Sequence, residues 1–92
     1  QDAAAAGLVE ESVLRVRPFL RHWLEADHGV RLTLADRTLD FAAAEHKTLT
    51  ELLGGEPLRV KDFPGLDREA ALRLARRLLR EGVAVVAGDD GR

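Results

Sequence analysis

Apolar residues recur at helical spacing through the first quarter of the chain. They fall at Val9, Val13, Val16, Leu20, Trp23 and Leu24, in the steps of four and three that mark one face of an α-helix. Pro18 lacks an N–H and crowds the preceding turn, so we expect a kink or two short helices that meet there. Asp27-His28-Gly29 is predicted to end the helix, with Gly29 as its left-handed stop. The spacing therefore predicts a leading helix over residues 8–29.

The period changes to two over residues 30–41. Val30-Arg31-Leu32-Thr33-Leu34 alternates strictly, and Thr38-Leu39-Asp40-Phe41 alternates again after the short polar segment 35–37. Such alternation is typical of strands with one buried face. We expect a β-hairpin whose apolar face, Val30, Leu32, Leu34, Leu39 and Phe41, lies on the core.

A second helix is predicted over residues 42–53, ended by Gly54-Gly55. Residues 57–60 are expected to be extended because the residue before a proline avoids the helical region. Residues 61–63 suffice for one helical turn before Pro64-Gly65 interrupts it.

Asp67 is a good N-cap for a third, longer helix. Its expected buried residues are Ala71, Leu72, Ala75, Leu78 and Leu79. Gly82 is predicted to end this helix before the strand Val83–Val86, and residues 88–91 could turn a wing that has no returning strand. Turn, long helix, glycine stop and strand are typical of the second half of a winged helix-turn-helix unit.

The predicted fold class is α+β: a winged helix-turn-helix-like domain with a preceding helix and hairpin and a truncated wing. We assign residues 1–7 to a disordered leader, 8–29 to a leading helix that serves as linker or docking element, 30–87 to the winged-helix domain and 88–92 to a flexible tail. Ninety-two residues make one domain.

Composition narrows the class of protein. The chain has no methionine, so we expect a domain excised from a longer protein, and no cysteine, which excludes disulfides and thiolate zinc sites. It has no membrane-spanning run or signal peptide, so we expect a cytoplasmic protein. Its basic residues are mostly arginine, a bias that suits a GC-rich bacterial genome.

Charge is distributed unevenly. Residues 1–57 carry six basic and ten acidic side chains (−4), whereas residues 58–87 carry seven and four (+3). Four arginines, Arg73, Arg76, Arg77 and Arg80, follow one face of the predicted third helix. In a helix-turn-helix protein these would be the candidate nucleic-acid contacts. The alternative is a solvated helix face, which the acidic Asp67 and Glu69 at the helix start favour because they repel phosphate.

No catalytic, cofactor-binding or metal-binding residues are predicted. None of the three histidines is followed by the acidic residue of an iron-binding His-x-Asp/Glu motif. They are His22, His28 and His46. Ser12 is the only serine and lacks the glycines of a nucleophile elbow. No cofactor is expected.

The leading helix supplies the candidate partner-docking residues, which are Val9, Val13, Val16, Leu20 and Trp23. Trp23 is expected in the core by its spacing, with partner anchoring as the alternative because tryptophan is enriched at interfaces.

Three segments resemble a known family. Leu52-Leu53-x-Gly55, the run from Val60 to Asp67, and Arg76-Arg77-Leu78-Leu79-x-x-Gly82-Val83 are similar to the C-terminal winged-helix domain of bacterial cupin-like JmjC oxygenases of the ribosomal-protein hydroxylase type. The likeness covers about residues 30–87. It implies a parent with an N-terminal β-helix that carries Fe(II) and 2-oxoglutarate, followed by a helical dimerisation region. No iron ligand carries over to this chain.

These observations predict a non-catalytic accessory or protein-interaction domain from a larger bacterial protein. Its partner would be the remainder of the parent chain or a second copy of the domain, without a membrane. The alternative is a DNA-binding winged helix-turn-helix regulator.

Overall fold

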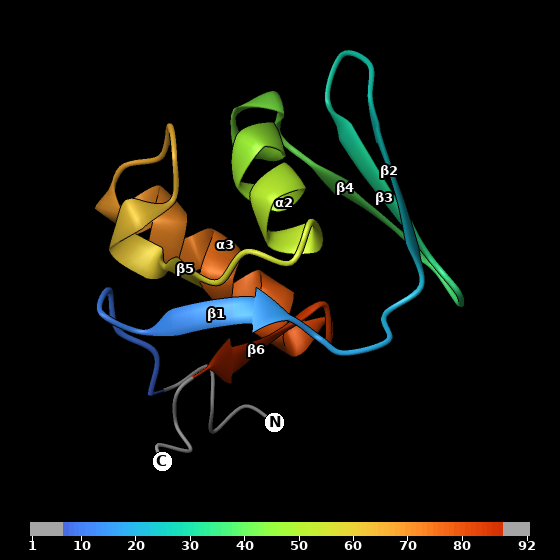
Figure 1. The fold of residues 1–92 in the computed structure, drawn as a ribbon. Helices are drawn as coiled ribbons and strands as arrows, with labels where there is room; N and C mark the ends of the chain where they lie inside the picture. Colours follow the sequence, from blue (N-terminus) through green and yellow to red (C-terminus); the bar gives the residue numbers. More distant parts are fainter. Residues whose placement is uncertain (1–6, 88–92) are drawn as a thin grey trace.

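Two three-stranded antiparallel sheets and two α-helices make up residues 7–87, the part of the chain that the computed structural model describes. In chain order the elements are β1 (Val13–Val16), β2 (His22–Ala26), β3 (Val30–Leu34), β4 (Thr38–Phe41), the 3-10 turn η1 (Ala43–Glu45), α2 (His46–Leu53), β5 (Leu58–Arg59), the 3-10 turn η2 (Val60–Asp62), α3 (Arg68–Arg80) and β6 (Ala84–Ala87). The strand orders are β5-β1-β6 and β2-β3-β4 (Figure 1).

The first sheet is centred on β1, which runs antiparallel to both of its neighbours. Leu14 is opposite Leu58 on one side and Val86 on the other, and its side chain is completely buried. Segments from the two ends of the described chain and from its middle therefore share one sheet (Figure 1).

The second sheet contains the predicted hairpin. Leu32 of β3 pairs with Leu39 of β4, and the alternating apolar side chains of both strands are buried, as the period of two predicted. The opposite face of this sheet is exposed and carries Trp23, Glu25, Arg31, Thr33, Thr38 and Asp40.

Local signals placed the helices correctly. The side chain of Asp67 caps α3 by accepting a hydrogen bond from Ala70 N at 2.8 Å. Gly82 follows the helix with φ +76°, a conformation that costs glycine little, and β6 begins two residues later. The helix predicted over 42–53 is present as η1 followed by α2.

Both sheets and both helices contribute to one apolar core. Its buried leucines and phenylalanines are Leu8, Leu14, Leu32, Leu34, Leu39, Phe41, Leu49, Leu52, Phe63, Leu74 and Leu78. Along α3 the buried positions are Ala71, Leu74, Ala75 and Leu78, whereas Leu72 and Leu79, which we expected in the core, are half-buried.

The prediction of a leading helix over residues 8–29 is wrong. This segment forms β1, a turn and β2, and His28 rather than Gly29 has the positive φ (+71°) in the turn that follows. As strands, the two halves on either side of Pro18 bond their backbone groups to β5, β6 and β3. A proline-broken helix would have left several of these groups without partners. The predicted wing turn over 88–91 lies outside the described residues.

Candidate protein-binding surface

A tight turn joins β1 to β2. Leu20 N donates a hydrogen bond to Arg17 O at 3.2 Å, which places Pro18 and Phe19 in the middle of the turn. Phe19 has φ +64°. Proline at the second position and a positive φ at the third define a type II turn, whose third position normally holds glycine or asparagine.

Phe19 gains no packing that would compensate for this backbone conformation. Its side chain is completely exposed (101%). The left-handed region costs a non-glycine residue roughly 1–2 kcal/mol, and an exposed ring adds no burial energy. Strain that the fold does not need is a common property of functional positions.

Replacing Phe19 by glycine is therefore expected to leave the fold at least as stable as the parent chain. The Phe19→Gly variant should exceed Phe19→Ala in free energy of unfolding by about 1 kcal/mol, because alanine keeps the steric conflict and glycine removes it. Urea unfolding of the three proteins measures this difference. Equal stability of the glycine and alanine variants would show that the turn is unstrained.

Trp23 lies on β2, three positions after the turn, and is exposed (65%), so the prediction of a core tryptophan is wrong. It belongs to the sheet face that is turned away from the helices. Its Nε1 donates a hydrogen bond to Glu25 Oε2 at 3.3 Å, a contact along the surface of the same strand.

The predicted docking residues do not share one face. Val13 and Val16 are half-buried on β1, whereas Val9 is exposed (54%) in the segment before it. Leu20 is half-buried against the core, and Trp23 lies on the other sheet. The exposed aromatic residues are instead Phe19 in the turn before β2, which the helical interpretation did not single out, and Trp23 on β2 itself. We call the turn 17–20 together with β2 the aromatic edge.

Basic side chains accompany the aromatic edge. Arg15, Arg17 and Arg21 are exposed, and none of them forms an ion pair with another residue in the described range. Arg17, Arg21 and Phe19 border a shallow depression between this turn and the β3–β4 turn. The turn thus places an apolar ring beside two arginines that form no ion pair with a described residue.

The arginine stripe on α3 is less uniform than the sequence indicated. Arg73, Arg76 and Arg80 are exposed, but Arg77 is half-buried and bound to the second sheet. Its Nη1 donates to Asp40 O at 2.8 Å, and its guanidinium lies 4.2 Å from the centre of the Phe41 ring. Arg77 therefore links α3 to β4, and its guanidinium is engaged in contacts within the fold.

Truncating Arg77 to alanine should reduce the free energy of unfolding by about 1–2 kcal/mol, since it removes both the cation–π contact and the hydrogen bond. Arg77→Lys should recover only part of this loss because an ammonium lacks the planar guanidinium. The matched control Arg76→Ala should change stability by less than about 0.5 kcal/mol. Thermal or urea denaturation separates the three variants, and equal losses for Arg77→Ala and Arg76→Ala would contradict the structural role.

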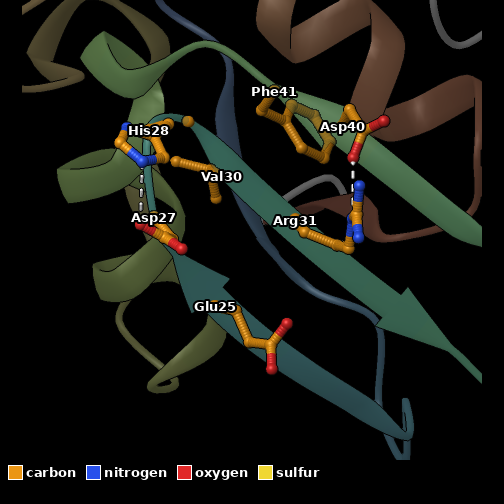
Figure 2. Close-up of a pocket in the computed structure, with 8 residues that line it drawn as sticks. Glu25, Asp27, His28, Val30, Arg31, Asp40 and Phe41 are labelled. Atoms are coloured by element: carbon orange, nitrogen blue, oxygen red, sulfur yellow. Dashed lines mark hydrogen bonds and ion pairs between the residues drawn. The ribbon is translucent and has the colours of Figure 1, made fainter.

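A depression of about 310 Å³ opens beside the β2–β3 turn and collects several charged groups (Figure 2). Arg31 Nε contacts Asp40 Oδ1 at 3.2 Å, and His28 Nε2 contacts Asp27 Oδ1 at 3.5 Å, all on exposed side chains. Glu25 points away from both pairs (Figure 2). All four paired side chains are exposed, so both ion pairs lie at the solvent-facing surface of the depression.

The histidines are all exposed: His22 on β2, His28 in the turn and His46 at the start of α2. His28 and His46 border one further depression. Within residues 7–87 no three histidine or acidic side chains are grouped closely enough to hold a metal ion. Nor does any helix in this range have the length and apolar character to cross a bilayer.

Glu11 forms a charged cluster on the side of the fold that carries β5. Lys61 Nζ lies 3.2 Å and Arg59 Nη1 3.3 Å from its two carboxylate oxygens. The hydrogen bond from Lys61, together with the positive charges of both partners, lowers the pKa of Glu11 from its ordinary value. All three side chains are exposed, so this cluster is a surface link between the segment before β1 and β5.

Comparisons of the sequence with models of known protein families and with curated proteins found no match.

Proposed function

We propose that this chain is a non-catalytic protein-interaction domain of the winged-helix type, which binds its partner through the aromatic edge. The observation that carries the proposal is Phe19, a fully exposed ring held in a left-handed turn. Exposed aromatic side chains flanked by arginine have the composition of binding hot spots. Trp23, with Arg17 and Arg21 nearby, extends that composition along β2.

The order of elements supports the winged-helix part of the proposal. α2, β5, the turn η2, α3 and β6 follow one another as a helix, a short strand, a helical turn, a long helix and a strand. β1 pairs with both β5 and β6, and so fills the central position of the sheet that would otherwise need a returning strand after β6.

The family resemblance leads us to propose a cupin-like JmjC oxygenase as the parent protein. Several residues that carry the resemblance have clear structural roles: Val60 and Phe63 are buried, and Gly65 and Gly82 adopt positive φ. In such a parent the iron ligands would lie in another domain. The reading frame before Gln1 is expected to encode a His-x-Asp motif within a β-helix domain. If sequencing of the gene shows no such motif, the proposed parent is refuted.

Site-specific photo-crosslinking tests the interaction function. The photoreactive residue p-benzoylphenylalanine would replace Phe19 or Trp23 in cells that produce the chain, with exposed Glu56 as a control position on another part of the surface. We expect protein adducts from positions 19 and 23 and few from position 56. Adducts of equal abundance at all three positions, or none at positions 19 and 23, would refute the proposal.

DNA binding is the second candidate function, because Arg73, Arg76 and Arg80 are exposed and form no ion pair with a described residue. Against it, Asp67 and Glu69 border the same depression on α3 as Arg73 and Arg76. These carboxylates would repel phosphate.

A salt titration with duplex DNA decides this alternative. Three arginine–phosphate contacts predict that log K falls with log salt at a slope near about −3. The slope should become shallower by about one for each arginine replaced by alanine. A protein-interaction domain should show little duplex binding at physiological salt and no such dependence.

A further inference from the structure

We propose that the partner at β2 is a second copy of this chain, paired antiparallel through the two β2 edges about a twofold axis at Leu24. The inference rests on the proposed function, because β2 is half of the aromatic edge, and it names the occupant of that strand. The product would be a continuous six-stranded sheet in the order β4-β3-β2-β2-β3-β4.

The backbone of β2 is free to accept another strand. Leu34 N donates to Arg37 O at 2.7 Å, so Leu34 bonds toward β4. Bonding direction alternates along an antiparallel strand, so Thr33 and Arg31 bond toward β2 and their partners Trp23 and Glu25 bond toward β3. The N–H and C=O groups of the remaining β2 residues, His22, Leu24 and Ala26, therefore point outward.

This edge lacks the usual protection against pairing. β2 is the outer strand of its sheet (Figure 1). Four of its five residues are exposed, and only Leu24 is half-buried against the core. The strand contains no proline and no lysine, two devices that commonly prevent edge-to-edge association.

One register uses the whole strand and matches its charges. Centring the pair on Leu24 aligns all five β2 residues and lets the outward groups of His22, Leu24 and Ala26 meet those of Ala26, Leu24 and His22 in the second copy. Each Arg21 then lies opposite an Asp27 of the second copy, at both ends of the paired stretch. Cross-strand pairs of opposite charge are favourable, whereas like charges are unfavourable.

The same register brings Trp23 opposite Glu25 of the second copy. Trp23 Nε1 already donates to Glu25 of its own strand, so the pairing adds the hydrocarbon stem of a second glutamate to the exposed ring. An isologous interface of this kind repeats every contact twice. Arg21, which has no ion pair with a described residue, acquires one.

Sedimentation velocity over roughly a hundredfold range of concentration tests the dimer. We expect a reversible monomer–dimer equilibrium in the full chain. Trp23 is the only tryptophan, so its fluorescence emission should shift to the blue as the dimer forms. Either a monomer at every concentration or an unchanged emission maximum on dimerisation would overturn the inference.

Charge reversal tests the register. Arg21→Glu and Asp27→Arg should each weaken dimerisation by about tenfold or more, because two symmetric pairs become repulsive. Mixing the two variants should restore association as a heterodimer in which every pair is again attractive. Arg73→Glu on α3 is the matched control and should leave the equilibrium unchanged. If neither charge reversal changes the dimerisation equilibrium, or if the mixture stays monomeric, both the register and the proposal are overturned.

Leu24→Pro tests the backbone pairing directly. Leu24 N–H points outward, so proline should preserve the β2–β3 hairpin while it removes the two central hydrogen bonds of the symmetric dimer. The variant should be monomeric with an unchanged circular dichroism spectrum, and a persistent dimer would overturn the inference. If this variant does not fold, the two charge-reversal variants still test whether the dimer forms through β2.

The photo-crosslinking experiment separates the two proposals. Adducts between two copies at position 23 support β2 pairing. Adducts at positions 19 and 23 with a different protein only, such as an extended segment added to the same edge, would overturn the dimer and leave the interaction function standing.

Discussion

Residues 30–92 on their own are expected not to fold. That fragment keeps the whole segment that resembles a winged helix, but it lacks β1, which within residues 7–87 is the strand that pairs with both β5 and β6. The fragment lacks Leu14, the completely buried side chain that β1 contributes to the apolar core. It also leaves β6 with no pairing partner among the remaining described strands. Circular dichroism and amide-resolved NMR should therefore report a largely unfolded chain.

Complementation provides the control for this deletion. A synthetic peptide of residues 7–29 supplies β1 and β2, and its addition should restore helical signal and amide dispersion in a concentration-dependent manner. A fragment 30–92 that unfolds cooperatively on its own would contradict the central role of β1, and would show that the predicted domain boundary at residue 30 is correct.

Leu14→Ala is expected to have the largest effect of any single truncation in β1. The side chain is fully buried, and removing a buried leucine typically costs about 2–5 kcal/mol in transfer and cavity terms. Domains of this size have total stabilities near the lower end of about 5–15 kcal/mol. The variant should lose more than about 10 °C in Tm, or fail to fold at all.

Arg15→Ala is the matched control for this substitution. Arg15 is the next residue of β1 and is exposed, so its truncation should change the free energy of unfolding by less than about 0.5 kcal/mol. Urea unfolding monitored by circular dichroism measures both variants. Equal effects at the two positions would mean that the alternation of buried and exposed residues along β1 is incorrect.

Sequence patterns predicted the elements whose signals are local. The alternation from Val30 to Phe41, the N-cap at Asp67 and the glycine stop at Gly82 each involve residues that are close in the chain, and all three are confirmed. The winged-helix class itself stays a prediction, since the structure establishes only an α+β fold with two antiparallel sheets.

The N-terminal strands could not be found in this way because their partners are distant. β1 pairs with residues 58–59 and 84–87, and nothing in residues 13–16 identifies those partners. β2 is an edge strand in which only Leu24 packs against the core, so its sequence shows no regular alternation of apolar and polar residues. Helical spacing of the apolar residues was therefore a coincidence of two short strands separated by a turn.

The residues of the candidate binding surface were not predicted correctly, for a related reason. Pro18 was interpreted as a helix interruption, although proline is also favoured at the second position of a β-turn. That alternative would have placed Phe19 at an exposed tip. Arg77 was assigned to a solvated stripe because the sequence does not reveal that β4 lies beside α3, with Phe41 and the Asp40 carbonyl within its reach.

Pairing of Val13 with Ala87 has a consequence for biosynthesis. β1 leaves the ribosome well before β6, and the sheet can close only after β6 has emerged. The residues between them are therefore translated while a segment rich in valine and leucine remains without its β6 partner. Contacts this distant slow folding, and an unpaired strand is where nascent chains aggregate. Folding of this domain should therefore depend on chaperone capacity and on the rate of translation more than the small size of the fold would suggest.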